Sequence, residues 1–425
     1  MSSSTLAISN SIAQSIGLQR ENESLLYNKE VRFAVDPEVS CTLLRGDNLA
    51  ALELLLNNSS PEIDFCYIDP PYNTGSKFIY NDKITSSNKG IWKKHSAWMS
   101  FMLPRLVAAQ SLLKDDGIIA VSIDDYEYTH LKILMDNIFG EQNHLGTIIV
   151  NRSVNGKGSR AHIATNHEYV VIFGKSKDSK MLGFPVAPKE NEYDREDAFG
   201  KFKIDGLFRK KGAHSAREDR PNMFYPLYCH PDGRVFTENK IAGLKEVYPL
   251  DKNGVEKRWL WGKEKASADS WKLYASKNGV VYVKNYLTDE KRIKARSIWS
   301  DNKYLTDKAT NEIVDIYSQK VFETPKPLGL IEDLITCCMP SNGYILDFFA
   351  GTGTTAHAAS NLNTKDNGNR KVILAEQNTR IDQQHIATTL GFDEIGEITE
   401  FRLRHIAEIN LNFNFDVFNL DESML

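Results

Sequence analysis

The order of apolar and helical segments is the feature that most constrains how this 425-residue chain can fold. Apolar runs suited to buried strands alternate with helical segments over residues 41–174, become irregular from about residue 175, and alternate again from about residue 324. Continuous apolar strands separated by helices predict a parallel sheet that is covered by helices on both faces. We therefore expect one α/β sheet whose two halves are separated in the sequence by an insertion.

The predicted organisation has four parts. A helical lead-in is expected over residues 1–40, the first half of the sheet over 41–174, the insertion over 175–322, and the second half with a C-terminal helix over 323–425. Strands are expected at 41–46, 64–68, 117–123, 146–150, 167–173, 343–349 and 371–376. Helices are expected at 48–56, 96–113, 126–138, 327–339, after Gly353, and at 402–410.

The distribution of charge also divides the chain. The formal net charge is −4, from 52 Lys+Arg against 56 Asp+Glu. Residues 151–310 hold 32 Lys+Arg and 21 Asp+Glu, a net of +11, which leaves −15 for the remainder. Such asymmetry indicates a polyanion-binding module that is attached to a body with a different task.

The composition excludes several classes of protein. The 41% hydrophobic and 25% charged residues are typical of globular domains. No apolar run is long enough to span a bilayer, and the N-terminus resembles no signal peptide, so we expect a cytoplasmic protein. The five cysteines are scattered and lack metal-ligand spacing, so neither a disulfide framework nor a metal site is expected from them. The histidines also lack metal-ligand spacing, and we expect packed or surface imidazoles at His95, His162, His167 and His357.

The first motif that carries chemistry is Asp-Pro-Pro-Tyr at residues 69–72, directly after an apolar run. This position is the carboxyl edge of the predicted sheet, where open α/β folds bind their ligands. The two prolines fix φ and remove two N–H donors, so the turn presents a carboxylate, bare carbonyls and an aromatic ring. Asp69 and the Pro70 carbonyl are suited to accept the hydrogens of an exocyclic amine, while Tyr72 can stack on its ring. The alternative is a rigid turn with a solvent-exposed Asp69.

The second motif is a glycine-rich turn within residues 346–355, between a predicted strand and a predicted helix. Such a turn places backbone N–H groups at a helix N-terminus, where nucleotide phosphates bind. A dinucleotide fingerprint would require a third glycine, but Ala356 occupies that position. Glu376 ends the next strand, where a carboxylate would reach ribose hydroxyls. The motif predicts a nucleoside-containing cofactor without fixing which one.

With these two motifs in this order, the sequence resembles the DNA amino-methyltransferases that use S-adenosylmethionine, in the permuted β-class order. The strings at 69–75, 78–82, 117–125, 138–141, 323–328 and 349–358 are most similar to the Mod subunits of type III restriction-modification systems. The resemblance covers about residues 41–174 and 323–425. It implies a doubly wound, mostly parallel, Rossmann-like methyltransferase sheet that is circularly permuted, with an inserted α+β target-recognition domain.

The resemblance also assigns roles to residues. The catalytic turn would be formed by Asp69, Pro70, Pro71 and Tyr72. The residues expected to bind the cofactor are Lys326 at its methionine end, Glu376 at its ribose, and the turn Asp347, Phe348, Phe349, Ala350, Gly351, Thr352, Gly353 and Thr354. Asp47 matches the position that meets the cofactor adenine, but its alternative role is the N-cap of the helix at 48–56, and the two interpretations stay open.

The reaction implied is direct methyl transfer from S-adenosylmethionine to the N6 amine of an adenine that is flipped out of duplex DNA. The same pocket would serve the N4 amine of cytosine, although Asp as the first residue of the tetrapeptide favours adenine in the family. An inactive DNA-binding specificity subunit is a second alternative, against which the intact Asp69, Tyr72, Gly351 and Glu376 argue. A dinucleotide-dependent oxidoreductase is disfavoured by the missing third glycine.

Double-stranded DNA is the expected partner, and the basic insertion is its expected reader. The residues predicted to contact DNA are Lys201, Lys203, Arg209, Lys210, Lys211, Arg217, Arg292 and Arg296. Binding that depends on this charge should weaken with salt. Type III Mod subunits continue well beyond the cofactor half, whereas this sequence ends at Leu425. We therefore expect a stand-alone or phage-borne enzyme as readily as a partner of a restriction subunit, and a homodimer also stays open.

Overall fold

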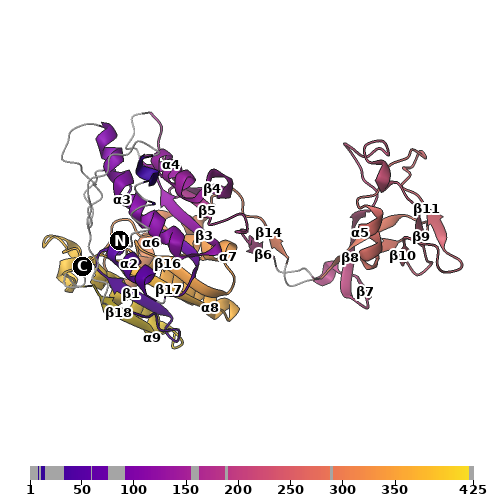
Figure 1. Cartoon of the computed structure of the whole chain (residues 1–425). Coiled ribbons are helices and arrows are strands. Elements are labelled where there is room, and N and C mark those ends of the chain that lie inside the picture. Colours follow the sequence, from indigo (N-terminus) through magenta and orange to yellow (C-terminus); the bar gives the residue numbers. More distant parts are fainter. Residues whose placement is uncertain are drawn as a thin grey trace. The chain divides into compact units, whose positions relative to one another are not determined.

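The computed structural model describes Ile8 and residues 11–14, 33–58, 60–74, 91–154, 162–186, 190–287 and 291–420. Most of the predicted helical lead-in and the motif residues at 75 and 78–82 lie outside this set. The chain divides into two compact units, Met1–Phe184 with Ile293–Leu425, and Pro185–Arg292 (Figure 1). The second unit begins ten residues later and ends thirty residues earlier than the insertion predicted at 175–322.

The first unit contains a nine-stranded sheet in the order β15-β4-β5-β3-β2-β16-β17-β1-β18. All neighbours are parallel except that β5 runs antiparallel to β3 and β4, which confirms the predicted mostly parallel α/β fold. The edge strands β15 and β18 had no counterpart in the prediction. The strands are β1 (Cys41–Arg45), β2 (Ile63–Ile68), β3 (Leu113–Ile123), β4 (His144–Asn151), β5 (His167–Gly174), β15 (Ile298–Trp299), β16 (Asn342–Asp347), β17 (Asn369–Glu376) and β18 (Phe415–Asn419).

Helices cover both faces of this sheet (Figure 1). One apolar cluster joins one face to α2 (Asn48–Asn57), α3 (Ile91–Leu112) and α4 (Tyr128–Phe139). A second cluster joins the other face to α7 (Leu328–Cys338), α8 (Thr354–Asp366) and α9 (Ile395–Ile409). Because side chains alternate along a strand, Ile119 and Val121 belong to the first cluster and Ile118 and Ala120 to the second. The central strands are therefore apolar throughout.

The two chemical motifs follow neighbouring strands of the sheet. Strands β2 and β16 are parallel neighbours, with Phe65 opposite Ile345 and Cys66 opposite Leu346. The chain continues from β2 to α3 on one face and from β16 to α8 on the other. Ligand sites in doubly wound sheets form where adjacent strands send their connections to opposite faces. The turns at 69–72 and 347–353 flank this point.

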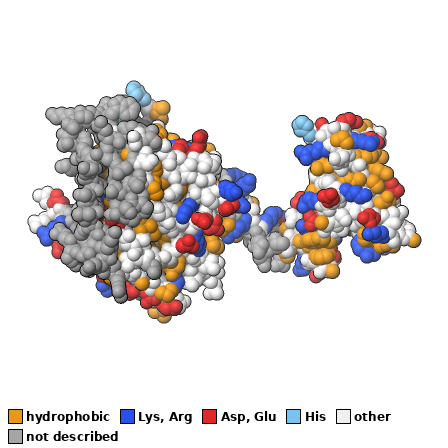
Figure 2. Space-filling view, viewed as in Figure 1, with side chains coloured by type: hydrophobic (Ala, Val, Ile, Leu, Met, Phe, Trp, Pro, Cys, Tyr) orange, Lys and Arg blue, Asp and Glu red, His pale blue; other side chains and the backbone are white. Residues whose placement is uncertain are grey.

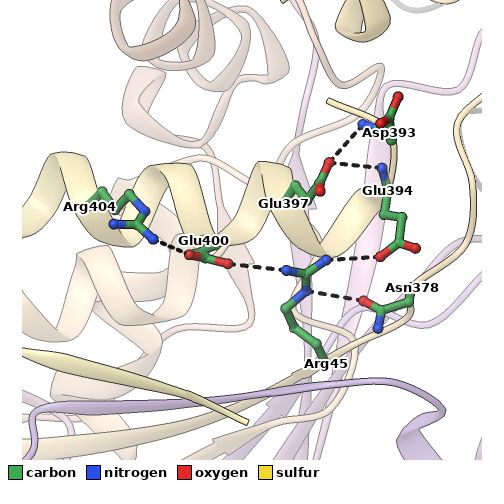
Figure 3. A network of polar contacts seen from close by, with 7 residues as sticks. All are labelled: Arg45, Asn378, Asp393, Glu394, Glu397, Glu400 and Arg404. Carbon is green, nitrogen blue, oxygen red and sulfur yellow. Dashed lines mark hydrogen bonds and ion pairs between the residues drawn. The ribbon is translucent and has the colours of Figure 1, made fainter. Parts of the chain in front are cut away.

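Arg45, the last residue of β1, fixes the start of α9 (Figure 3). Its guanidinium forms ion pairs with Glu394 at 2.9 Å and Glu400 at 3.2 Å, and donates to the Asn378 side chain at 3.1 Å. Glu397 accepts from the Glu394 N–H at 3.2 Å, which completes a capping box. These contacts place the N-terminus of α9 against the ends of β1 and β17. The helix predicted at 402–410 thus begins earlier, at Ile395.

The second unit is a small α+β domain with its own apolar core around Phe208, Leu227, Trp259 and Val281. Strands β10 (Val235–Phe236), β9 (Leu227–Cys229) and β11 (Lys245–Val247) form one sheet, and β12 (Leu273–Ala275), β13 (Val281–Tyr286), β8 (Gly200–Leu207) and β7 (Arg195–Asp197) form another. A short helix, α5 (Lys263–Ala268), follows the core residue Trp259. Strands β6 (Phe184–Pro185) and β14 (Arg292–Ile293) pair where the chain enters and leaves the unit.

The remaining described elements are short or peripheral. Helix α6 (Thr306–Tyr317) belongs to the first unit and packs through Ile313 and Tyr317 against residues around Phe392. No helix among the described residues is both long and apolar enough to cross a membrane. Single 3-10 turns occur at Glu141–Asn143, Glu190–Glu192, Pro221–Met223, Ser270–Lys272, Asn302–Tyr304 and Ile386–Leu390.

Candidate active site

A cavity of about 390 Å³ lies at the carboxyl ends of β2 and β16. Both chemical motifs contribute to its wall, together with Phe101 of α3, Phe322 and residues 324–326. Of the predicted site residues, Asp47, Pro70, Tyr72 and Gly353 are not among those that line it. The predicted residues that do line it are Asp69, Pro71, Lys326, Asp347, Phe348, Phe349, Ala350, Gly351, Thr352, Thr354 and Glu376.

The glycine turn is closed by hydrogen bonds to two carboxylates, of which Asp347 is buried and Glu376 is partly buried. Asp347 accepts from the Thr355 hydroxyl at 2.5 Å and from the Phe349 N–H at 3.1 Å. Glu376, at the end of β17, accepts from the Gly351 N–H at 2.6 Å. Gly351 has a φ of 54°, in the left-handed region that favours glycine. The turn therefore depends on its carboxylates for shape.

Burial changes the protonation of these two carboxylates. It raises the pKa of Asp347 to about 7 and the pKa of Glu376 to about 8. Within the described part of the chain, neither carboxylate forms an ion pair. The cavity wall thus contains two acidic groups that a cationic ligand would stabilise in their ionised forms.

Arg402 of α9 holds the glycine turn by hydrogen bonds, a role that was not predicted from the sequence. Its side chain is fully buried, and one guanidinium nitrogen donates to the hydroxyls of Thr352 at 2.9 Å and Thr354 at 3.0 Å. Another donates to Nδ1 of His357 at 3.3 Å. Burial lowers the pKa of His357 to about 3, so this packed imidazole is a neutral acceptor. The signal in the sequence was an arginine on the apolar face of an amphipathic helix.

The Pro-Pro turn is anchored on both sides. The indole N–H of the fully buried Trp98 donates to the Pro71 carbonyl at 2.7 Å. Asn73, which is fully buried and has a φ of 59°, donates through its amide to Oε1 of Glu127 at 2.6 Å. Glu127 is itself fully buried at the start of α4. Neither Trp98 nor Glu127 stood out in the sequence, because each reaches the turn from another element.

Glu127 is also the centre of a histidine pair. Nδ1 of His95 lies 2.8 Å from Oε1 of Glu127, and Nδ1 of His130 lies 2.9 Å from Oε2. The two imidazoles are stacked with ring centres 4.2 Å apart. Because Oε1 already accepts from Asn73, we interpret the group as a hydrogen-bonded support of the Pro-Pro turn. His95 was expected to be a packed or surface imidazole, and its part in this support had no sequence signal.

Lys326 lies at the Pro-Pro turn. Its ammonium is 2.7 Å from Oδ2 of Asp69 and 2.9 Å from the Tyr72 hydroxyl, and 3.7 Å from Oε2 of Glu168. Burial alone would lower the pKa of Lys326, but the carboxylates of Asp69 and Glu168 raise it above its ordinary value. Lys326 is therefore a cation. Glu168, a buried residue of β5, is a further site residue that the sequence did not indicate.

Asp47 is the N-cap of α2. Its side chain accepts from the N–H groups of Leu49 at 2.9 Å and Ala50 at 3.0 Å, which confirms the N-cap interpretation. Arg105 of α3 also contacts it, at 3.3 Å. Its role at a cofactor adenine stays a prediction.

The basic charge of residues 151–310 is shared between the two units. Residues 185–292 hold 22 Lys+Arg and 17 Asp+Glu, a net of +5, and the flanks 151–184 and 293–310 hold 10 and 4, a net of +6. Basic and acidic side chains are interspersed on the visible face (Figure 2). Two of the predicted DNA contacts are in ion pairs, Lys203 with Glu192 at 2.5 Å and Arg217 with Glu256 at 2.7 Å. Arg296 belongs to the first unit.

A cavity lined by a Pro-Pro turn and a glycine turn, at the carboxyl edge of a doubly wound sheet, is typical of the ligand site of an α/β enzyme. The particular family follows from comparison with known sequences. A family model described as DNA methylase (N6_N4_Mtase) matches residues 63–400, and the chain belongs to this family.

Individual relatives extend this result. The Type II methyltransferase M.KpnI of Klebsiella pneumoniae is 51% identical over 96% of this chain and 97% of its own length. The Mod subunit of the type III restriction-modification enzyme EcoPI, from Escherichia phage P1, is 34% identical over 86% of this chain and 62% of its own length. The StyLTI Mod subunit of Salmonella typhimurium is 30% identical over 86% and 56%. This chain thus spans about three fifths of these Mod subunits and nearly all of M.KpnI.

Proposed function

We propose that this protein transfers a methyl group from S-adenosylmethionine to the N6 amine of an adenine that is flipped out of duplex DNA at a specific site. The observation that carries the proposal is that Asp69 and the glycine turn line one cavity. Membership of the DNA methylase family and 51% identity to a named Type II methyltransferase support it.

The residues of the cavity fit S-adenosylmethionine. Asp347, which is buried, and Glu376, which is partly buried, have no ion-pair partners among the described residues. A sulfonium or ammonium group would favour their ionised forms. Each oxygen of the Glu376 carboxylate accepts one backbone N–H, which leaves lone pairs for ribose hydroxyls. Phe349 and Phe101 supply apolar surface on the wall. When bound, the cofactor supplies an electrophilic methyl group.

The Pro-Pro turn supplies the chemistry at the amine. The lone pair of an exocyclic amine is delocalised into its ring, so the amine is a weak nucleophile. Acceptance of its hydrogens by Asp69 and the Pro70 carbonyl favours a pyramidal nitrogen with a usable lone pair. Because the Trp98 indole already occupies the Pro71 carbonyl, the turn is held while the Pro70 carbonyl serves the substrate. Placing the amine beside the methyl group provides much of the remaining acceleration.

The target base has to leave the duplex to reach this cavity, at a cost of a few kcal/mol. Stacking on Tyr72 would offset part of that cost. We assign recognition of duplex DNA to the unit at 185–292, acting with the basic flanks at 151–184 and 293–310, which together hold the net charge of +11. We also propose a cytoplasmic enzyme of bacterial or phage restriction-modification, in which the homodimer and a restriction subunit are alternative partners.

Adenine is favoured over cytosine because the tetrapeptide begins with Asp69. An inactive specificity subunit is disfavoured, since Asp69, Gly351 and Glu376 are all present at the cavity. The test is incubation of the purified protein with unmethylated genomic DNA and isotopically labelled S-adenosylmethionine, followed by mass spectrometry of the nucleosides. We expect labelled N6-methyladenine with the wild type and none with Asp69→Ala, while the surface variant Asp136→Asn should behave as the wild type. Labelled N4-methylcytosine would support the alternative, and label that survives Asp69→Ala would refute the assignment of the turn.

The DNA-binding assignment has a separate test. Lys210→Gln with Lys211→Gln removes two predicted phosphate contacts from the second unit. If both contact phosphate, the slope of log K against log salt for duplex binding should become shallower by about 1.8, which is about 0.9 for each contact. The matched pair Lys371→Gln with Lys365→Gln, in β17 and α8, should leave the slope unchanged.

A further inference from the structure

Lys326 is the cation of the candidate active site, and its contacts differ from the role that the family resemblance implies. The resemblance places it at the methionine end of the cofactor. In the structure its ammonium is instead bound to the catalytic turn, at 2.7 Å from Asp69 and 2.9 Å from the Tyr72 hydroxyl. The side chain is 11% exposed, so these contacts are largely shielded from water.

The two oxygens of Asp69 have different surroundings. Oδ2 accepts from Lys326, whereas Oδ1 is buried and has no hydrogen-bond partner among the described residues. A buried carboxylate oxygen without a donor is costly, and a substrate N–H would satisfy it. The geometry therefore separates the carboxylate into one oxygen that Lys326 binds and one buried oxygen whose acceptor capacity is unused among the described residues.

The position of Lys326 on Tyr72 also leaves room for a base. The ammonium is 2.9 Å from the hydroxyl oxygen but 5.1 Å from the ring centre, so it contacts the hydroxyl end of the side chain. A planar base stacks on the face of an aromatic ring. Lys326 can accordingly hold Asp69 and Tyr72 together while a base occupies the ring face.

We propose that Lys326 is a positioning residue of methyl transfer, which holds Asp69 through Oδ2 so that Oδ1 accepts a hydrogen of the target amine. This inference rests on the proposed function. It goes beyond it by assigning Lys326 to the amine and not to the methionine part of the cofactor.

The charges around Asp69 explain why a cation is needed there. Asp69 faces Lys326, the hydroxyls of Tyr67 and Tyr72, and the carboxylates of Glu168 and Asp347. Arg152 lies 3.7 Å from Glu168 and balances that carboxylate from the other side. Without Lys326, Asp69 would be one of three neighbouring carboxylates, and their mutual repulsion would displace its side chain. A displaced Asp69 would no longer present Oδ1 to the amine.

The test compares Lys326→Met with the wild type at saturating DNA and S-adenosylmethionine. We expect the single-turnover rate to fall about a hundredfold, because misplacement of a reacting group by about 1 Å has an effect of that size. The dissociation constant of S-adenosylmethionine should change less than about threefold. Lys326→Arg, which keeps the charge and a donor to Oδ2, should restore much of the single-turnover rate.

Two controls make the result decisive. Lys303→Met removes another lysine that pairs with an aspartate, Asp333 at 2.7 Å, from an exposed position, and it should change neither readout. In the double variant Asp69→Asn with Lys326→Met, the second substitution should add no further loss, because Lys326 acts through Asp69. An S-adenosylmethionine dissociation constant raised more than about tenfold, with the single-turnover rate at saturating cofactor unchanged, would overturn the proposal in favour of the cofactor role. A wild type that does not methylate DNA would instead refute the proposed function.

Discussion

The two turns that form the cavity hold their carboxylates in opposite ways. At the glycine turn, Asp347 and Glu376 accept hydrogen bonds from hydroxyl and backbone N–H donors, and burial raises the pKa of each to about 7 and 8. At the Pro-Pro turn, Asp69 is paired with the ammonium of Lys326. The first arrangement favours a cationic ligand, because a positive charge stabilises the ionised forms of both acids. The second already supplies the counter-charge of its carboxylate from the protein.

The side chains that hold the two turns in place also differ in the charge of their partners. Arg402 holds the glycine turn through the neutral hydroxyls of Thr352 and Thr354, and the nearest carboxylate, Glu312, is 3.9 Å away. The Pro-Pro turn is held by Trp98 and by Asn73, whose own partner is the fully buried Glu127. On the proposed function, the glycine turn binds a charged ligand and the Pro-Pro turn binds a neutral one, because different side chains support each turn.

The largest expected effect is on the support of the glycine turn. Arg402→Met leaves the buried hydroxyls of Thr352 and Thr354 without their charged donor. We expect the free energy of unfolding to fall by about 3–5 kcal/mol, since each hydrogen bond to a charged group contributes about 1.5–3 kcal/mol. Urea denaturation of the first unit measures it. Arg404→Met, which removes a mostly exposed arginine from the same helix, should cost less than about 1 kcal/mol. Equal losses of stability in the two variants would show that the glycine turn does not depend on Arg402.

The next effect is the pH dependence of stability without cofactor. The pKa of Glu376 rises from an ordinary 4.5 to about 8, so the folded protein binds this proton more tightly than the unfolded chain does. Its contribution is present below about pH 4.5 and is lost as the pH rises to about 8. Since one pKa unit is about 1.4 kcal/mol, the loss amounts to a few kcal/mol.

Glu376→Gln should remove this contribution to the pH dependence of stability. The melting temperature of the cofactor-free wild type should therefore fall between pH 5 and pH 8.5 more steeply than that of the variant, as measured by scanning calorimetry. Bound S-adenosylmethionine should also flatten the wild-type curve of melting temperature against pH, because its cationic groups favour the ionised form of Glu376. Parallel curves for the two proteins would show that Glu376 ionises as freely in the folded protein as in the unfolded chain.

The smallest effect concerns the support of the Pro-Pro turn. Glu127→Gln keeps the shape of the side chain but removes the charge that accepts from Asn73 and His95. We expect a decrease of about tenfold in the single-turnover rate through a displaced turn, with S-adenosylmethionine binding unchanged. Glu141→Gln, in an exposed turn, is the control. Loss of cofactor binding in Glu127→Gln would mean that the two turns are not independently supported.

Much of this site could be predicted because its parts are local in sequence. The Pro-Pro turn and the glycine turn each follow an apolar strand directly, so residues 69–72 and 347–353 were placed at one sheet edge by strand polarity alone. The order of the two motifs around a basic insertion was likewise visible from periodicity and charge. The antiparallel direction of β5 was not, since an apolar strand buried on both faces reads alike in either direction.

The supports were missed because each is remote in sequence from the turn it holds. Trp98, Glu127 and Arg402 reach the site from α3, the start of α4 and α9, and nothing local distinguishes them from ordinary core or helix residues. Lys326 was placed at the site, but its contact with Asp69 joins positions 257 residues apart. The charge of the insertion gave a net of +11 without showing that about half of it belongs to flanks in the first unit.

The two turns are assigned separate tasks, binding of the cofactor and transfer to the amine, and measurements on one variant of each turn can separate them. S-adenosylmethionine affinity and single-turnover methyl transfer at saturating cofactor are determined for Asp69→Ala and for Glu376→Ala. We predict that Asp69→Ala binds S-adenosylmethionine as the wild type does but transfers no methyl group to DNA. Glu376→Ala should bind the cofactor at least about tenfold more weakly, as expected for the loss of hydrogen bonds to a charged group. If instead Asp69→Ala abolished cofactor binding, or Glu376→Ala left it unchanged, the division of tasks between the turns would be contradicted.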